Sequence, residues 1–369
     1  MKNTFGQSVS VTLFGESHGA AVGAVLDGLA PGIAVDNDFI SSQLRRRRPN
    51  GKTDTPRIEN DNFQILSGAF NGKTTGTPLT IIIPNENVKS SDYKYGVARP
   101  SHADYTGYMK YHGYEDYRGG GHFSGRVTAA LVAVGAIAQS ALKGLGINIG
   151  THIVACGGVG DTMFLQTDNV ENAVLALQSK NFPVISDVAE EQISAKITDA
   201  AKRNDSIGGF IETAIVGMPA GVGEPWFDSV EGLLSHALFS IGGIKGVNFG
   251  IGVGFGGLLG SYANDEFKYE NGRIVTETNN NGGINGGITN GMPIIFSCAV
   301  KPTPSIGKEQ QTVNFLTKEN TEIQIKGRHD PAIIRRICPV VDSVCALVIC
   351  DLLAGRYGTD IFLKGFDER

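Results

Sequence analysis

Apolar residues recur along this chain in two patterns, short runs that suit strands and longer stretches that suit helices. The runs predict strands over residues 9–14, 79–83 and 210–216, with another short apolar run at 24–29. Apolar positions spaced three to four apart predict helices over residues 38–47, 124–145, 187–202 and 340–353. The pattern therefore indicates a mixed helix and strand protein, without fixing how its layers are arranged.

The predicted helices differ in how much of their surface is apolar. The stretch 124–145 is apolar on nearly all faces, which is typical of a buried helix. The stretch 187–202 is amphipathic, with Val188, Ile193, Ile197 and Ala201 expected on one side, and predicts a surface helix. The helix over 340–353 is expected to close at Gly355.

Residues 242–291 differ in composition from the rest of the chain and are rich in glycine and asparagine. A flexible linker is one interpretation. Apolar residues are interleaved with the glycines, which favours a backbone that presses against a ligand instead. No clear repeat or domain boundary emerges, and chemically active segments come from both ends of the chain. We therefore expect residues 1–369 to form a single catalytic unit.

Composition narrows the class of protein. The hydrophobic share of 41% argues against disorder, and the 50 glycines follow no three-residue period, which excludes collagen. A formal net charge of -5 disfavours a nucleic-acid binder. The five cysteines form no Cys-x-x-Cys pair, so neither a disulfide framework nor a metal site is expected. Without a signal peptide or a long apolar span, we expect a cytoplasmic protein with no membrane segment.

Three short polar segments carry the candidate chemistry, and each contains a histidine: His18, His102 and His329. Each histidine taken alone has a plain structural explanation, and Asp330 can be a turn residue before Pro331. Histidine is the only side chain whose ordinary pKa lies between 5 and 8. Since all three segments also hold acidic or basic residues, they suggest one acid–base site assembled by folding.

Arginines near these segments suggest that the site handles an anion. The run Arg45–Arg48 can be a solvated helix end that complements the helix dipole, or a nucleic-acid patch, which the acidic total disfavours. The glycine run 119–121 precedes the buried helix, whose start favours anions, with Ser124 as its N-cap. A tight turn with a cap is the structural alternative. The glycines of 250–257 lack a flanking strand and helix, so a dinucleotide site is not expected.

These segments resemble the chorismate synthase family over nearly the whole chain. The matching motifs, in the family's order, are residues 15–19, 46–49, 99–105, 117–121, 242–247, 282–288, 301–305 and 327–331. The resemblance implies an α+β fold, a β-α-β sandwich with helices between antiparallel sheets, and a homotetramer. It implies that 5-enolpyruvylshikimate 3-phosphate loses phosphate and a ring proton to give chorismate, with reduced FMN required but no net redox change. NADPH is expected only if the chain reduces its own flavin.

The resemblance also implies roles for individual residues. His18 would protonate the departing phosphate, His102 would stabilise the reduced flavin, and Asp330 would help take a proton from flavin N5. The implied substrate-binding residues are Ser17, Arg46, Arg47, Lys52, Arg99, Arg126 and Arg328. The implied cofactor-binding residues are His122, Phe123, Ser124, Gly242, Gly243, Gly286, Lys301, Pro302, Thr303, Pro304, Ser305 and Arg328.

The chain departs from the family pattern at three positions. The family often has arginine at the place of His122, glutamate at that of Val127 and an acidic residue at that of Asn248.

Two other functions stay open at this point. One is a nicotinamide-dependent flavin reductase, for which no dinucleotide fingerprint is present. The other is a non-catalytic protein that binds phosphorylated ligands or nucleic acid through Arg45–Arg48.

Overall fold

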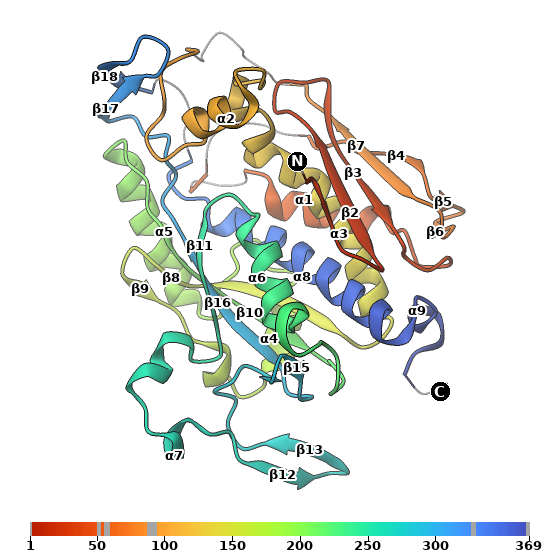
Figure 1. Ribbon diagram of the computed structural model, residues 1–369. Helices are drawn as coiled ribbons and strands as arrows, with labels where there is room; N and C mark the ends of the chain where they lie inside the picture. The colour runs from red at the N-terminus through yellow and green to blue at the C-terminus, as the bar shows by residue number, and fades with distance from the viewer. Residues whose placement is uncertain (1, 50–52, 55–59, 87–93, 326–329, 367–369) are drawn as a thin grey trace.

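Two five-stranded antiparallel sheets enclose the main helices of the computed structural model, which describes residues 2–49, 53–54, 60–86, 94–325 and 330–366 (Figure 1). The first sheet has the order β1 (Thr4–Phe5), β2 (Ser10–Gly15), β3 (Ala21–Asp27), β7 (Leu79–Pro84), β4 (Gln64–Ser67). The second has the order β11 (Ile244–Phe249), β16 (Ile294–Val300), β10 (Gly209–Val216), β8 (Asn148–Cys156), β9 (Val159–Gly160).

Three helices fill the space between the sheets, namely α1 (Asn37–Arg47), α3 (Thr128–Lys143) and α8 (Ile334–Tyr357) (Figure 1). Helix α3 packs on β3 and β7, helix α8 packs on β8 and β10, and the two helices contact each other. Alternate residues of β7, Leu79, Ile81 and Ile83, are buried towards this layer. The implied sandwich of helices between antiparallel sheets is confirmed.

The remaining elements surround this framework. The other helices are α2 (Asp104–Tyr111), α4 (Val170–Leu177), α5 (Asp187–Lys202), α6 (Val230–Phe239), α7 (Gly260–Ala263) and α9 (Ile361–Lys364). Four two-stranded hairpins are β5–β6 (Ala69–Phe70, Lys73–Thr74), β12–β13 (Phe267–Glu270, Arg273–Thr276), β14–β15 (Ile284–Asn285, Ile288–Thr289) and β17–β18 (Glu309–Asn314, Glu319–Gln324). Short 3₁₀ turns are η2 (Arg118–Phe123), η3 (Gly125–Val127), η4 (Phe164–Gln166), η5 (Trp226–Asp228) and η6 (Gly252–Gly257).

The predicted strands and the buried helix are confirmed, with small shifts at their ends. The helix predicted over 124–145 is η3 followed by α3, and Ser124 accepts a hydrogen bond from the Arg126 N–H at 3.3 Å, as expected of an N-cap. Helix α5 has the predicted bounds. Its buried residues are Ala189, Ile193 and Ile197, whereas Val188 is 64% exposed, so the predicted apolar face was wrong there.

Helix α8 is longer than predicted at both ends. It begins at Ile334 and passes through Pro339 and Gly355 before it ends at Tyr357. Its first turn carries apolar side chains that the core buries, including Ile334 and Ile337, which stabilises helix in spite of the proline. The cap is Gly358, whose φ of 79° is a conformation that glycine adopts readily.

The linker interpretation of residues 242–291 is wrong. This segment supplies β11 to the second sheet and forms the hairpins β12–β13 and β14–β15. Gly282 shows why glycine is needed, because its φ is 63° and a Cβ there would lie 2.5 Å from the carbonyl oxygen of Ile295. The close approach is between protein backbones, and a ligand is not required to explain this glycine.

Two helical stretches, Gly125–Lys143 and Ile334–Tyr357, are long and apolar enough to cross a membrane by length and composition alone. In their most apolar windows, 72% and 94% of the residues are buried inside the protein. The sandwich core accounts for this apolar surface, because a helix between two sheets is covered on nearly all sides.

Helices α3 and α8 approach so closely that Gly135 has no room for a side chain. A Cβ on Gly135 would lie 2.2 Å from Cβ of Ser343. We expect Gly135→Ala to lower the free energy of unfolding by roughly 1–3 kcal/mol, measured by urea denaturation. Ser343→Gly should restore part of the loss in the double mutant. Gly260→Ala, where a Cβ meets nothing within 4 Å, is the control, and equal effects at the two glycines would contradict the packing argument.

Candidate active site

Two of the predicted catalytic side chains, His18 and His102, lie against consecutive glycines of the turn η2. Gly119 has a φ of 62° and Gly120 a φ of 85°. A Cβ on Gly119 would lie 2.2 Å from Cε1 and Nδ1 of His18, and one on Gly120 would lie 3.2 Å from Nε2 of His102. Segments more than eighty residues apart are therefore brought to one turn, and each imidazole has a glycine backbone as its neighbour.

The loop that carries His18 follows β2 and is held from two sides. The Ser17 N–H donates to the carbonyl of Gly121 at 3.0 Å, which ties the loop to the same glycine turn. The side-chain amide of Asn85 donates to the carbonyls of residues 16 and 19, both at 2.9 Å. Ser17 itself is 7% exposed. These bonds fix the backbone on both sides of the histidine.

His102 lies just before α2 and shares a carboxylate with Arg99. Nδ1 of His102 is 2.7 Å from Oδ1 of Asp104, and Arg99 bonds the same carboxylate through Nε at 2.8 Å and NH2 at 2.7 Å. Burial alone would raise the pKa of Asp104, but its bonds with Arg99 and His102 more than offset this and lower it. The predicted catalytic histidine and the predicted substrate-binding arginine thus form one ionic group.

Arg47 and Arg126 meet at a second carboxylate, that of Asp61. NH2 of Arg47 lies 3.2 Å from Asp61 Oδ2, NH1 of Arg126 bonds Asp61 Oδ1, and Arg48 Nε is 3.9 Å from Oδ2. Burial would raise the pKa of Asp61, but the charges of Arg47 and Arg126 prevail and lower it. Three guanidinium groups therefore lie around this one carboxylate.

This arginine cluster is linked to the histidine loop. Nε of Arg126 donates to Oδ1 of Asn85 at 3.0 Å, and the other end of the Asn85 amide holds the loop of His18. NH1 of Arg47 donates to the carbonyl of Gly125 at 3.4 Å, at the start of η3. The arginine cluster and the loop that carries His18 therefore belong to one network of hydrogen bonds.

Arg46 does not join this cluster, contrary to its predicted role in substrate binding. Its NH1 group pairs with Oδ2 of the buried Asp342 in α8 at 3.0 Å and bonds Gln43 at 2.7 Å. Arg46 is 9% and Arg47 3% exposed, so the interpretation of Arg45–Arg48 as a solvated face fails for both. A residue one position along a helix points about 100° away, which sends Arg46 into the core while Arg47 reaches Asp61.

Asp330 lies beside the C-terminal end of α1, because an arginine of α8 bonds both. Its Oδ2 accepts from NH1 of Arg336 at 2.6 Å, and Nε of Arg336 donates to the carbonyl of Arg47 at 2.9 Å. The neighbouring Arg335 donates to the carbonyls of Arg46 at 3.0 Å and Arg48 at 2.6 Å. The last carbonyls of α1 are thus capped by two arginines, and Asp330 is tied to the segment that carries the arginine cluster.

The predicted cofactor segment 301–305 lies next to the histidine segment. Nζ of Lys301 donates to the carbonyl of Ser101 at 2.7 Å, and the Lys301 N–H donates to that of Gly243 at 2.9 Å. The Thr303 carbonyl accepts from the Ser206 hydroxyl at 2.7 Å, while the Thr303 hydroxyl is buried with no partner among the described residues. Partial burial and Lys245 lower the pKa of Lys301.

The predicted glycine pair 242–243 and the prolines of 301–305 belong to the same neighbourhood. A Cβ on Gly242 would meet nothing within 4 Å, whereas one on Gly243, whose φ is 106°, would lie 2.9 Å from Cδ1 of Ile333. Pro302, Pro304 and Ser305 continue the segment that begins at Lys301. Open space beside Gly242 and a bare hydroxyl at Thr303 are features of a site that takes a ligand.

Three further predicted cofactor residues have the following places. Gly286 is in the turn of the β14–β15 hairpin, with β15 in the lower half of Figure 1 and α2 near the top. The Phe123 ring packs on α2, 6.0 Å from the ring centroid of Tyr111. His122 turns Nδ1 to the carbonyl of Gly15 at 2.8 Å. The cofactor role of Gly286 stays a prediction, and Lys52, Arg328 and His329 lie outside the described residues.

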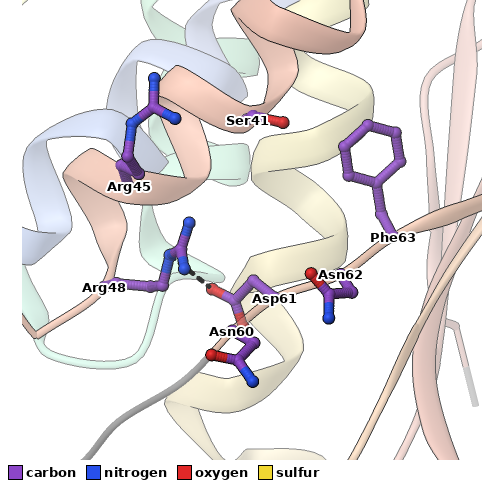
Figure 2. A pocket seen from close by; sticks show the side chains of 7 residues that line it. All are labelled: Ser41, Arg45, Arg48, Asn60, Asp61, Asn62 and Phe63. Carbon is purple, nitrogen blue, oxygen red and sulfur yellow. Dashed lines mark ion pairs between the residues drawn. The ribbon is translucent and has the colours of Figure 1, made fainter.

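A polar cavity opens on the outer side of the arginine cluster, with a volume of about 360 Å³ (Figure 2). Its lining consists of Ser41, Arg45, Arg48, Asn60, Asp61, Asn62 and Phe63. Figure 2 shows the Arg48 guanidinium turned to Asp61 from α1, with Arg45 one turn away on the same helix. The arginine run thus faces the core through Arg46 and Arg47 and this cavity through Arg45 and Arg48.

Sequence reasoning missed several residues that hold the site together. Asp61 sits in a polar loop with no motif to mark it, and Asn85 and Arg336 lie just outside the predicted strand 79–83 and the predicted helix 340–353. Asp104 was part of a quoted motif but was assigned no role. Its spacing from Arg99 and His102 was the available signal, because all three residues fall at the start of one short helix.

The fold and site define a two-sheet sandwich protein in which imidazole and guanidinium groups meet at one glycine turn. A family model described as chorismate synthase matches residues 9–354. The chain therefore belongs to the chorismate synthase family, whose members are enzymes.

Individual relatives agree with this assignment. The chorismate synthase of Dehalococcoides mccartyi strain BAV1 is 43% identical, over 95% of this chain and 96% of that protein. That of Methanosarcina barkeri strain Fusaro is 45% identical, over 95% of both chains. A solved structure titled "Crystal Structure of Chorismate Synthase" is similar with a TM-score of 0.75 and 27% identity, over 96% of this chain and 94% of that one.

Removal of the buried charge at Asp61 should be costly. We expect Asp61→Asn to lower the free energy of unfolding at pH 7 by roughly 3–5 kcal/mol, because Arg47 and Arg126 lose their shared partner. The exposed Glu319→Gln is the control. Denaturant unfolding measures both, and an effect of Asp61→Asn no larger than that of the control would contradict this role.

The same charge predicts a pH dependence. Since the pKa of Asp61 is lowered in the folded protein, its stabilisation is complete above the ordinary aspartate pKa of about 3.9. It is lost as the pH falls below that value through the folded pKa. Unfolding experiments between pH 2 and pH 5 should therefore show a weaker loss of stability with falling pH in Asp61→Asn than in the wild type.

Proposed function

We propose that this chain catalyses the chorismate synthase reaction, in which 5-enolpyruvylshikimate 3-phosphate loses phosphate and a ring proton to give chorismate. Membership of the family supports this proposal, and the observation that carries it is the placement of His18 and His102 on Gly119 and Gly120. The reaction breaks a C–O and a C–H bond and forms a second ring double bond. It needs a group that receives charge at the departing phosphate and an anion pocket for the rest of the substrate.

The arginine cluster supplies the anion pocket. Arg47, Arg48 and Arg126 gather around the carboxylate of Asp61, so three guanidinium groups are concentrated at one place. The substrate carries a phosphate and two carboxylates. Charge-assisted hydrogen bonds from guanidinium groups contribute about 1.5–3 kcal/mol each. A polyanion would therefore be held by the same positive charges that repel one another around Asp61.

His18 is the residue that supports the departure of phosphate. A leaving phosphate gains negative charge, and a positioned imidazole stabilises it by holding a proton on the ring nitrogen nearest to it. Its loop is fixed by the Ser17 and Asn85 hydrogen bonds, so little reorganisation is needed when the substrate arrives.

Residues near Lys301 fit a reduced FMN. The Thr303 hydroxyl is buried without a partner among the described residues, Gly242 leaves open space, and Lys301 is bound to the carbonyl next to His102. When bound, the reduced flavin supplies the electron-rich ring that promotes elimination and is regenerated at the end. His102 would lie beside it, and Lys301 and Thr303 would orient it through their polar groups.

The test is an anaerobic assay with reduced FMN and 5-enolpyruvylshikimate 3-phosphate. We expect phosphate and chorismate to form together in the wild type and not with oxidised FMN alone. His102→Ala and Asp330→Asn should each lower kcat by about 10²-fold or more while KM changes little. Folded wild-type protein that releases no phosphate would refute the proposal, and equal losses in kcat and substrate affinity would refute the assigned roles. Addition of NADPH with oxidised FMN tests whether the chain reduces its own flavin.

We further propose that the chain assembles as a homotetramer. Large apolar side chains are exposed on η5, η6, α7 and the β12–β13 hairpin, among them Phe227 at 93%, Val253 at 88%, Tyr262 at 73% and Tyr269 at 78%. Exposed apolar side chains, when they gather into a patch, mark protein interfaces.

Light scattering after size exclusion measures this directly. We expect a particle of four chains of 39.1 kDa, and Phe227→Ser or Tyr269→Ser should shift it to smaller species. Glu319→Gln, on a different hairpin, is the matched control. A wild-type mass of one chain at micromolar concentration would contradict the tetramer.

A further inference from the structure

A single carboxylate at the start of α2 organises two residues of the site at once. Oδ1 of Asp104 lies 2.7 Å from Nδ1 of His102 and 2.7 Å from NH2 of Arg99. Oδ2 accepts from the backbone N–H of Arg99 at 2.9 Å and from its Nε at 2.8 Å. The side chains are largely covered, with 14% exposed for Arg99 and Asp104 and 17% for His102. Both carboxylate oxygens are therefore committed, Oδ1 to His102 and Arg99 together and Oδ2 to Arg99 alone.

These distances decide which nitrogen of His102 carries the ring proton. Arg99 NH2 also lies 3.1 Å from Nδ1, so two arrangements have to be compared. If Nδ1 were bare, its lone pair would face the lone pairs of Oδ1 at 2.7 Å, which is repulsive. If Nδ1 carries hydrogen, it donates to Oδ1, and the 2.7 Å between Nδ1 and Oδ1 is the length of an ordinary charge-assisted hydrogen bond. The carboxylate therefore selects the Nδ1–H form.

The other ring nitrogen then faces the glycine turn. Nε2 of His102 is the atom that would lie 3.2 Å from a Cβ on Gly120, so the turn approaches it with no side chain in between. Nε2 is thus the nitrogen left to exchange a proton or a hydrogen bond with a ligand. A carboxylate that fixes one imidazole nitrogen and directs the other is a recurring arrangement in acid–base catalysis.

We propose that Asp104 is a positioning residue that holds His102 in its Nδ1–H form, directs Nε2 to the bound ligand over Gly120, and locks the Arg99 side chain beside it. This inference rests on the proposed function for its catalytic consequence, while the tautomer itself is a property of the folded chain. Asp104 is suited to this task because its lowered pKa keeps it ionised, and hence purely an acceptor, at neutral pH.

Asp104→Asn keeps the Oδ2 side of this arrangement and changes the Oδ1 side. The side-chain oxygen of asparagine keeps the acceptor at the Oδ2 position for the backbone N–H and Nε of Arg99. Its NH2 group puts a donor where Oδ1 accepted from Nδ1 of His102 and from NH2 of Arg99. A donor at that position favours the opposite tautomer, with hydrogen on Nε2. Arg99→Lys is the complementary variant, because it removes the two-pronged contact with Asp104 and leaves the contact of Asp104 with His102.

The tautomer is read by long-range ¹H–¹⁵N correlation in protein labelled at histidine, with His102→Asn to assign the signal. The wild type should show His102 as the Nδ1–H form, a measurement that needs no variant at Asp104. Asp104→Asn should move it to Nε2–H and lower kcat by about 100-fold with a smaller change in KM. Arg99→Lys should raise KM and keep the tautomer. Asp199→Asn, which breaks an exposed ion pair on α5, should change none of these.

Two results would overturn the proposal. One is a wild-type spectrum in which His102 is mainly the Nε2–H form. The other is an Asp104→Asn protein, folded by circular dichroism, that keeps both the wild-type tautomer and the wild-type kcat. If the wild type shows the Nδ1–H form that Asp104→Asn reverses, but releases no phosphate with reduced FMN and substrate, the positioning role stands and the proposed function fails.

Discussion

The site depends on the buried carboxylate of Asp61, because it lets guanidinium groups gather where water is excluded. Arg47 and Arg126 come from different helical segments, and each would be unstable near the other without a negative partner. With this partner, three guanidinium groups gather at one place, which is the arrangement that the proposed anion pocket needs. From Arg126 the network continues through Asn85 to the loop of His18, so the electrostatic requirement of the pocket also positions an acid–base residue.

The helices between the sheets supply the rigidity that this arrangement needs. Arg335 and Arg336 of α8 bind the last carbonyls of α1, and Arg46 of α1 pairs with the buried Asp342 of α8. Because α3 and α8 meet at Gly135 without space for a side chain, the helix that follows the glycine turn is fixed against the helix that follows Asp330. The catalytic segments are thus attached to the ends of elements that cannot shift independently.

The apolar pattern was sufficient for most elements and insufficient for others. The exact bounds of α5 and the position of β7 followed from periodicity, since each has one buried and one open face. The prediction for helix α8 is too short, because burial on nearly all sides holds the helix together through Pro339 and past Gly355, where the pattern predicts its end. For the glycine-rich segment, the pattern predicts a backbone that presses against a ligand, whereas at Gly282 the close approach is to the backbone of Gly250 and Ile295.

By itself the sequence determined which residue types the chain brings to its chemistry, and its motifs identified the family, because short segments such as those around His18 and His102 retain their order and composition. Only the tertiary structure decided what each residue faces. Adjacent residues such as Arg46 and Arg47 diverge by helical geometry, one into an ion pair with Asp342 and the other to Asp61. Asp61 acquires its role only when folding surrounds it with guanidinium groups, since an electrostatic partner is set by distance in space and leaves no spacing rule in the chain for residues this far apart.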